Sequence, residues 1–275
     1  MPIDYEKRNN VAYITLNNPE KANILDKQTS DAISEAWIDM WEDRDIRCAI
    51  VTGTGDKHFC GGHNLAPRPD LTDADREYLK AQRLYWPLAG TVHGQKTGVD
   101  GRMGDHYPRV WKPVIAAVNG PAVGVGMVLP MFADIRFAAD TAKFGTAFTK
   151  RGLVPEYGLG WLLPRLIAPS KAFDLMYTAR LVEADEALDM GLVDRVYPTN
   201  ELQAAVMEYA REIAKGVSPR STRVVKEMVY QGLDQGFDAA MENCLAEMAD
   251  AHTSEDFKEG IAAWKDKRAP NFSGK

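Results

Sequence analysis

Cysteine is scarce in this chain and widely spaced. Cys48, Cys60 and Cys244 are its three cysteines in 275 residues, and no Cys-x-x-Cys pair occurs. An odd, scattered set argues against a disulfide framework and offers no zinc-ligand spacing, so we expect no metal site. The polar start of the chain, MPIDYEKRNN, lacks the apolar core of a signal peptide. Both observations favour a reducing, cytoplasmic location.

A basic surface and an unbroken apolar span are also missing. The net charge is -6 and the isoelectric point is about 5.5, and no helix face is rich in lysine and arginine, so we expect no nucleic-acid partner. One uncharged run, Val114 to Ala133, is as long as a membrane span. It is interrupted by Asn119, Gly120, Pro121 and Pro130. We therefore expect a buried strand, a turn and a helix there, and no membrane partner.

The glycine motifs that bind phosphates are incomplete. The segment NGPAVGVGMVLPMFADIRFAA has no lysine followed by serine or threonine after Gly126, which excludes a P-loop. A dinucleotide fingerprint requires a third glycine where this chain has Leu129. What the segment retains is a glycine-opened helix N-terminus, whose unpaired N–H groups and positive dipole end suit an oxyanion.

Hydrophobic periodicity predicts strands early in the chain and helices later. Because the two alternate over much of the chain, the pattern indicates an α/β fold. The predicted elements are a hairpin turning at Asn9-Asn10, a helix from Asp26 to Arg44 capped by Asp26, buried strands in CAIVTGTG and PVIAAVNG, a short strand pair in IRFAADTAKFGT, and helices filling most of Ser170 to Lys267.

Several segments resemble, in order, the landmarks of the crotonase, or enoyl-CoA hydratase/isomerase, superfamily. They are NPEKANILD, AIVTGTGDKHFCGGHNLA, KPVIAAVNGPAVGVGMVLPMFADIRFAADTAKFG, EADEALDMGLVDRVYP and EGIAAWKDKRAPNF. The resemblance implies a β-β-α superhelix with a helical C-terminal trimerisation region. It divides the chain into a spiral core, 1–198, that holds the acyl-CoA site, and an oligomerisation region, 199–275. It also implies a homotrimer or homohexamer and an acyl-CoA thioester substrate. No separate cofactor is implied, since coenzyme A is part of the substrate.

The resemblance assigns an oxyanion hole to two backbone N–H groups, those of His63 and Val125. The glycines beside them, Gly61, Gly62 and Gly124, would let the backbone approach a thioester oxygen. Further substrate-binding positions follow from the same motifs and, for Arg68, from its place after the first loop: they are Lys21, Ala22, Asn64, Leu65, Ala66, Arg68 and Lys267.

The acid-base residues depart from the hydratase pattern. Hydratases of the family use two glutamates, and this chain has Val128 and Phe148 at those positions. Glu156 follows Pro155 where isomerases of the family carry a single catalytic glutamate, although Tyr157 replaces the usual glycine. We therefore expect a 3-enoyl-CoA to 2-enoyl-CoA isomerase with Glu156 as its proton shuttle.

Other functions stay open at the level of sequence. A hydratase could use an unfamiliar acid, with the histidines His58, His93 and His106 as candidates. Another lyase or hydrolase of the family is a further alternative. A non-catalytic acyl-CoA binder would also keep the oxyanion hole while lacking the hydratase glutamates.

Overall fold

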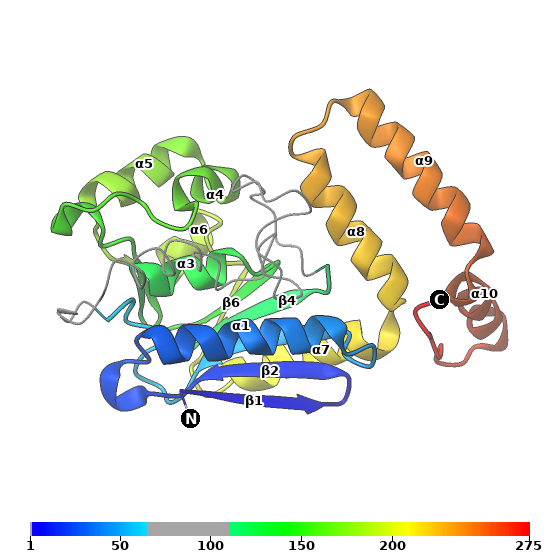
Figure 1. Ribbon diagram of the computed structural model, residues 1–275, viewed down its shortest axis with the longest axis horizontal. Coiled ribbons are helices and arrows are strands. Elements are labelled where there is room, and N and C mark those ends of the chain that lie inside the picture. Colours follow the sequence, from blue (N-terminus) through cyan, green and yellow to red (C-terminus); the bar gives the residue numbers. More distant parts are fainter. Residues whose placement is uncertain (1, 65–110) are drawn as a thin grey trace, which may run out of the picture.

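The computed structural model describes residues 2–64 and 111–275, whose strands form two sheets (Figure 1). The larger sheet has the order β1-β2-β3-β4-β6-β9 and is antiparallel only between β1 and β2. The smaller sheet has the order β5-β7-β8. The strands are β1 (Ile3–Arg8), β2 (Val11–Leu16), β3 (Cys48–Gly53), β4 (Val114–Val118), β5 (Ala122–Val123), β6 (Ile135–Ala139), β7 (Lys143–Gly145), β8 (Val182–Glu183) and β9 (Arg195–Tyr197).

The predicted hairpin is confirmed. Asn9 and Asn10 connect β1 to β2 with φ angles of 53° and 65°. Two consecutive positive φ angles are typical of the tight turns that match strand twist, and asparagine tolerates them better than most residues. The predicted strands β3 and β4 are buried along their whole length, as expected for central strands of a parallel sheet.

Helices cover both faces of the larger sheet and extend beyond it. Short 3-10 turns precede α1 and α4. These elements are η1 (Pro19–Lys21), α1 (Lys27–Glu42), α3 (Val125–Met131), η3 (Thr149–Arg151), α4 (Leu159–Leu166), α5 (Pro169–Thr178), α6 (Ala184–Asp189), α7 (Leu202–Gly216), α8 (Pro219–Gly232), α9 (Phe237–Thr253) and α10 (Glu255–Asp266). As predicted, the Asp26 carboxylate caps α1 by accepting a hydrogen bond from the Thr29 N–H at 2.8 Å.

The two faces of the sheet bury separate cores. On one face, Ile14 packs in a cluster with Ile33 and Met40 of α1. On the other, Phe137 packs in a cluster with Val206 and other residues of α7. The buried residues of α7, which begins after residue 198, are Leu202, Val206, Ala210 and Ala214, and all four belong to this second cluster.

Two predictions about the middle of the chain have different outcomes. The interrupted run from Val114 to Ala133 forms β4, β5 and α3, as predicted. The predicted strand pair was wrong in its pairing, because β6 joins β4 and β9 in the larger sheet while β7 joins β5 and β8 in the smaller one. The physical reason is that β6 and β7 each pair with strands that are distant in the sequence and belong to different sheets. Nearness in sequence does not decide which strands pair.

The last three helices project away from this core. In Figure 1, α8, α9 and α10 lie on the opposite side of the molecule from α4 and α5. None of the residues of α9 is buried. Across the described part of the chain, no helix combines the length and the apolar character that a membrane crossing requires.

Candidate active site

Two loops leave the neighbouring parallel strands β3 and β4 at one edge of the larger sheet. The Cys60 N–H donates to the Pro121 carbonyl at 3.2 Å, and the Val123 N–H donates to the Cys60 carbonyl at 3.0 Å. Cys60 and Ala122 thereby form a short parallel bridge. The loop after β3 is therefore fixed against the start of α3, at the carboxyl edge where ligands of α/β sheets commonly bind.

His63 is held by a second short bridge. The Leu25 N–H donates to the Gly62 carbonyl at 2.8 Å, and the Asn64 N–H donates to the Leu25 carbonyl at 2.8 Å. The Gly62 carbonyl and the His63 N–H belong to one trans peptide group and point in opposite directions, so the His63 N–H is directed away from Leu25. His63 also lines a cavity.

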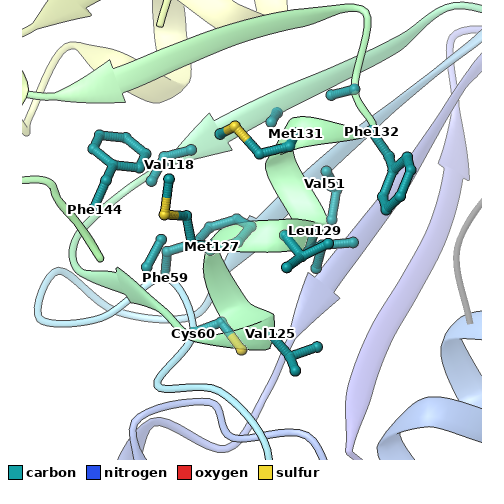
Figure 2. Close-up of a cluster of buried hydrophobic side chains, with 14 of the residues drawn as sticks. Val51, Phe59, Cys60, Val118, Val125, Met127, Leu129, Met131, Phe132 and Phe144 are labelled. Carbon is teal, nitrogen blue, oxygen red and sulfur yellow. The ribbon is translucent and has the colours of Figure 1, made fainter. Parts of the chain in front are cut away.

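Val125 is the first residue of α3, and its amide therefore belongs to the first turn of the helix. Gly124 anchors this turn by donating its N–H to the Gly145 carbonyl at 2.8 Å. A Cβ atom on Gly126 would overlap the Cys60 carbonyl, so only glycine permits this contact. Figure 2 shows Cys60 and Val125 together at the N-terminal end of α3.

The two loops meet around a small cavity of about 60 Å³. Gly62 has a φ of +100°, and a Cβ there would lie 2.8 Å from the Val123 carbonyl oxygen. This close approach brings the two loops side by side. The lining residues are Gly61, Gly62, His63, Val123, Gly124, Val125, Ala147, Phe148, Arg151, Leu153 and Glu156.

Glu156 reaches the cavity from the loop between η3 and α4. The residues after it, Tyr157 and Gly158, have φ angles of 53° and 74°, which turn the chain into α4. The Glu156 carbonyl accepts a hydrogen bond from the Leu159 N–H at 3.0 Å. The glutamate is half-buried, so one carboxyl group shares a partly enclosed space with the His63 and Val125 backbone.

Comparison with known proteins identifies the family of this site. The model of the enoyl-CoA hydratase/isomerase family matches residues 6–275. The chain belongs to the enoyl-CoA hydratase/isomerase family. It is thus an acyl-CoA enzyme of the crotonase superfamily, as the sequence predicted.

Individual relatives of the family match over nearly the whole chain. The (E)-benzylidenesuccinyl-CoA hydratase of Thauera aromatica is 33% identical over 275 residues, with 100% of both chains covered. The 1,2-epoxyphenylacetyl-CoA isomerase of Escherichia coli is 30% identical, with 96% of this chain and 95% of the relative covered. The crystal structure of an enoyl-CoA hydratase from Bacillus anthracis superposes with a TM-score of 0.86 at 28% identity, with 100% of both chains covered. The predicted crotonase fold is therefore confirmed.

At the two positions where the sequence resemblance predicts the hydratase glutamates, this member of the family has buried apolar side chains. Val128 is fully buried in the main core and does not line the cavity. Phe148 is buried and does line it. Neither side chain can donate or accept a proton, so Glu156 is the carboxylic acid among the described lining residues.

The predicted substrate-binding residues lie in different parts of the structure. The Ala22 carbonyl accepts a hydrogen bond from the Gly61 N–H at 2.8 Å, which places exposed Lys21 next to the first loop. Asn64 follows His63 and is half-buried. Lys267 is the C-cap of α10, a helix that lies on the opposite side of the molecule from α4 in Figure 1.

The remaining predicted candidates lie outside the site or outside the described residues. His58 is half-buried and absent from the cavity lining, and its carbonyl accepts a hydrogen bond from the Asn23 side chain at 2.9 Å. Leu65, Ala66, Arg68, His93 and His106 all fall outside the residues that the structure describes.

Sequence reasoning missed Arg151 and Leu153, which complete the cavity wall beside Glu156. Both stand in the segment TKRGLVPE, in which Glu156 is the residue that the family resemblance points to. Arg151 and its neighbour Lys150 are both positively charged, and a turn as short as η3 has no periodic pattern that indicates which of them lines the cavity.

Proposed function

We propose that this chain shifts the double bond of a 3-enoyl-CoA to give a 2-enoyl-CoA. In this reaction the Glu156 carboxylate removes a proton from C2, and the electrons move into the thioester carbonyl to form a dienolate. The backbone N–H groups of His63 and Val125 hold the dienolate oxygen. Glu156 then returns the proton to C4, which leaves the double bond between C2 and C3.

The observation that carries the proposal is the composition of the cavity. Glu156 lines it together with His63 and Val125, whereas Phe148 stands where a hydratase would have a second acid. Hydration needs one group to activate water and another to deliver a proton, while isomerisation needs one base that acts twice. The isomerase name of the Escherichia coli relative is compatible with this chemistry.

A hydratase is the second candidate. The relatives from Thauera aromatica and Syntrophomonas wolfei carry hydratase names, and the latter is 34% identical over 275 residues. Such an activity would need a second proton-transfer group besides Glu156. The alternative to an enzyme is a protein that binds acyl-CoA without catalysis, and it would turn over no acyl-CoA ester.

Product analysis with a panel of 3-enoyl-, 2-enoyl- and 3-hydroxyacyl-CoA esters separates these functions. The Glu156→Gln variant keeps the side-chain shape but removes the base, so isomerase kcat should fall roughly a hundred- to ten-thousand-fold while acyl-CoA affinity changes little. Glu212→Gln makes the same change on an exposed face of α7 and should leave kcat unaltered. Unchanged isomerisation by Glu156→Gln, or hydration without isomerisation by the parent, would contradict the proposal.

A further inference from the structure

Arg151 introduces a positive charge into the wall of the candidate active site. It ends the 3-10 turn η3 and lines the same cavity as His63, Val125 and Glu156. The other described lining residues are apolar side chains or glycines, apart from His63 and Glu156. Arg151 is exposed to solvent, and it is the arginine among the described residues that line this cavity.

The Arg151 guanidinium makes one hydrogen bond to the backbone. Its Nη1 donates to the Ala147 carbonyl at 3.0 Å, and Ala147 also lines the cavity. In the described part of the chain, Arg151 forms no ion pair with a carboxylate, in contrast to Arg180, which bonds both Asp174 and Glu186. The other guanidinium N–H groups are therefore available to a ligand in the cavity.

The position of Arg151 relates it to the acyl group of a substrate and not to coenzyme A. The predicted coenzyme A residues Lys21 and Ala22 adjoin the cavity through Gly61. Arg151 belongs to a different wall, in which the Thr149 hydroxyl of η3 donates to the Met176 carbonyl of α5 at 2.9 Å. If the thioester oxygen lies at the His63 and Val125 amides, the other residues that line the same small cavity, Arg151 among them, border the acyl part of the substrate.

We infer that this site takes CoA thioesters whose acyl chain carries a free carboxylate, and that Arg151 recognises that carboxylate. The planar guanidinium matches a carboxylate with two parallel hydrogen bonds, which a lysine cannot reproduce. The inference rests on the proposed function in so far as it takes the two backbone amides as the thioester site. It adds a substrate class to that function.

Binding of saturated thioesters tests the inference without requiring turnover. Glutaryl-CoA and adipyl-CoA carry a terminal carboxylate, and pentanoyl-CoA and hexanoyl-CoA have the same carbon counts without it. By calorimetry, the parent protein should bind at least one carboxylated thioester roughly ten- to a hundredfold more tightly than its neutral counterpart. Arg151→Gln should abolish this preference, and Arg151→Lys should keep part of it.

Lys150 provides a matched control for the loss of one positive charge. It is exposed, precedes Arg151 in η3 and does not line the cavity, so Lys150→Gln should retain the full preference. Free coenzyme A should bind the parent and Arg151→Gln equally.

Two results would overturn the inference. The parent could bind carboxylated and neutral thioesters equally, a measurement that does not depend on the folding of any variant. Arg151→Gln could weaken free coenzyme A and all thioesters alike, which would assign Arg151 to coenzyme A or to loop structure. Failure of the parent to bind any CoA compound would contradict the proposed function itself, whereas lack of isomerase turnover with selective binding would contradict that function and leave the role of Arg151 intact.

Discussion

At the scale of single residues, the proposed oxyanion hole depends on a backbone contact that admits no side chain. A Cβ on Gly126 would overlap the Cys60 carbonyl, the group that also accepts the Val123 N–H. Gly126→Ala should therefore push the two loops apart and misplace the His63 and Val125 amides. Because displacement by about 1 Å can cost about a hundredfold in rate, we expect kcat/KM to fall by that order. Overpacking should also lower the free energy of unfolding by about 1–3 kcal/mol, measured by urea titration.

Gly160 offers the matched control for this substitution. It lies inside α4, and a Cβ there would meet no atom within 4 Å. Gly160→Ala should leave kcat/KM unchanged and raise the free energy of unfolding by about 0.4–1 kcal/mol, since alanine restricts the unfolded chain and favours a helix. Equal kcat/KM values for the Gly126 variant and the parent would show that the loop contact does not position the amides.

Sequence reasoning at this scale depends on whether a role belongs to the backbone or to a side chain. His63 and Val125 could be proposed because the family resemblance assigns the two backbone N–H groups to positions that glycines mark in this sequence. Glu156 could be proposed because it follows Pro155 at the position where the family resemblance places the catalytic glutamate of isomerases. Arg151 could not, because the choice between it and Lys150 depends on how η3 sits on α5, a contact between segments distant in sequence.

At the scale of elements, one buried ion pair joins α8 to the core. The Lys226 ammonium lies 2.8 Å from the Asp134 carboxylate and donates to the Lys112 carbonyl at 3.0 Å. Asp134 in turn accepts the Val114 N–H at 2.7 Å, at the start of β4. Burial lowers the pKa of Lys226, and the Asp134 charge opposes that shift. The first of the C-terminal helices is therefore tied to a central strand of the sheet.

Removing one partner of this pair should destabilise the protein strongly. Lys226→Met leaves Asp134 without its counter-charge, so the free energy of unfolding should fall by about 3–5 kcal/mol in urea titrations. Arg223→Gln on the same helix is the control, because its contact with Glu227 at 3.4 Å is a half-exposed pair one turn apart, worth about 0.3–0.5 kcal/mol. Similar losses for the two variants would mean that the Lys226 pair does not hold α8 to the core.

The positions of helices and strands could be predicted better than the pairing of the strands. The alternating residues around Asn9 and Asn10 and the Asp26 cap are local signals, and both predictions are confirmed. The pairing of β6 and β7 was wrong, since each strand is buried by strands far away in the sequence. Periodicity reports which side of an element is buried, but it does not report what covers that side.

At the scale of the whole molecule, the C-terminal helices leave a large apolar surface uncovered. Phe237 at the start of α9 is 76% exposed and Trp264 in α10 is 78% exposed. Other exposed apolar residues on α8, α9 and α10 are Val225, Val229, Met241, Leu245, Met248, Phe257 and Ile261. Exposed apolar surface of this extent is typical of an interface between subunits. The fold itself could be predicted because family landmarks occur in order along the chain, whereas this unpaired surface becomes visible only once the helices are placed.

We expect the protein to assemble as a homotrimer or homohexamer through this surface. Light scattering at micromolar concentration should give a mass about three or six times 30.5 kDa. Phe237→Glu and Trp264→Glu each place a charge where an apolar contact is expected, so they should shift the mass toward that of the single chain. Lys258→Gln changes the net charge by the same amount at an exposed site on α10 and should leave the mass unaltered. A monomeric parent would contradict the assembly, and an oligomer insensitive to both glutamate substitutions would place its interface elsewhere on the molecule.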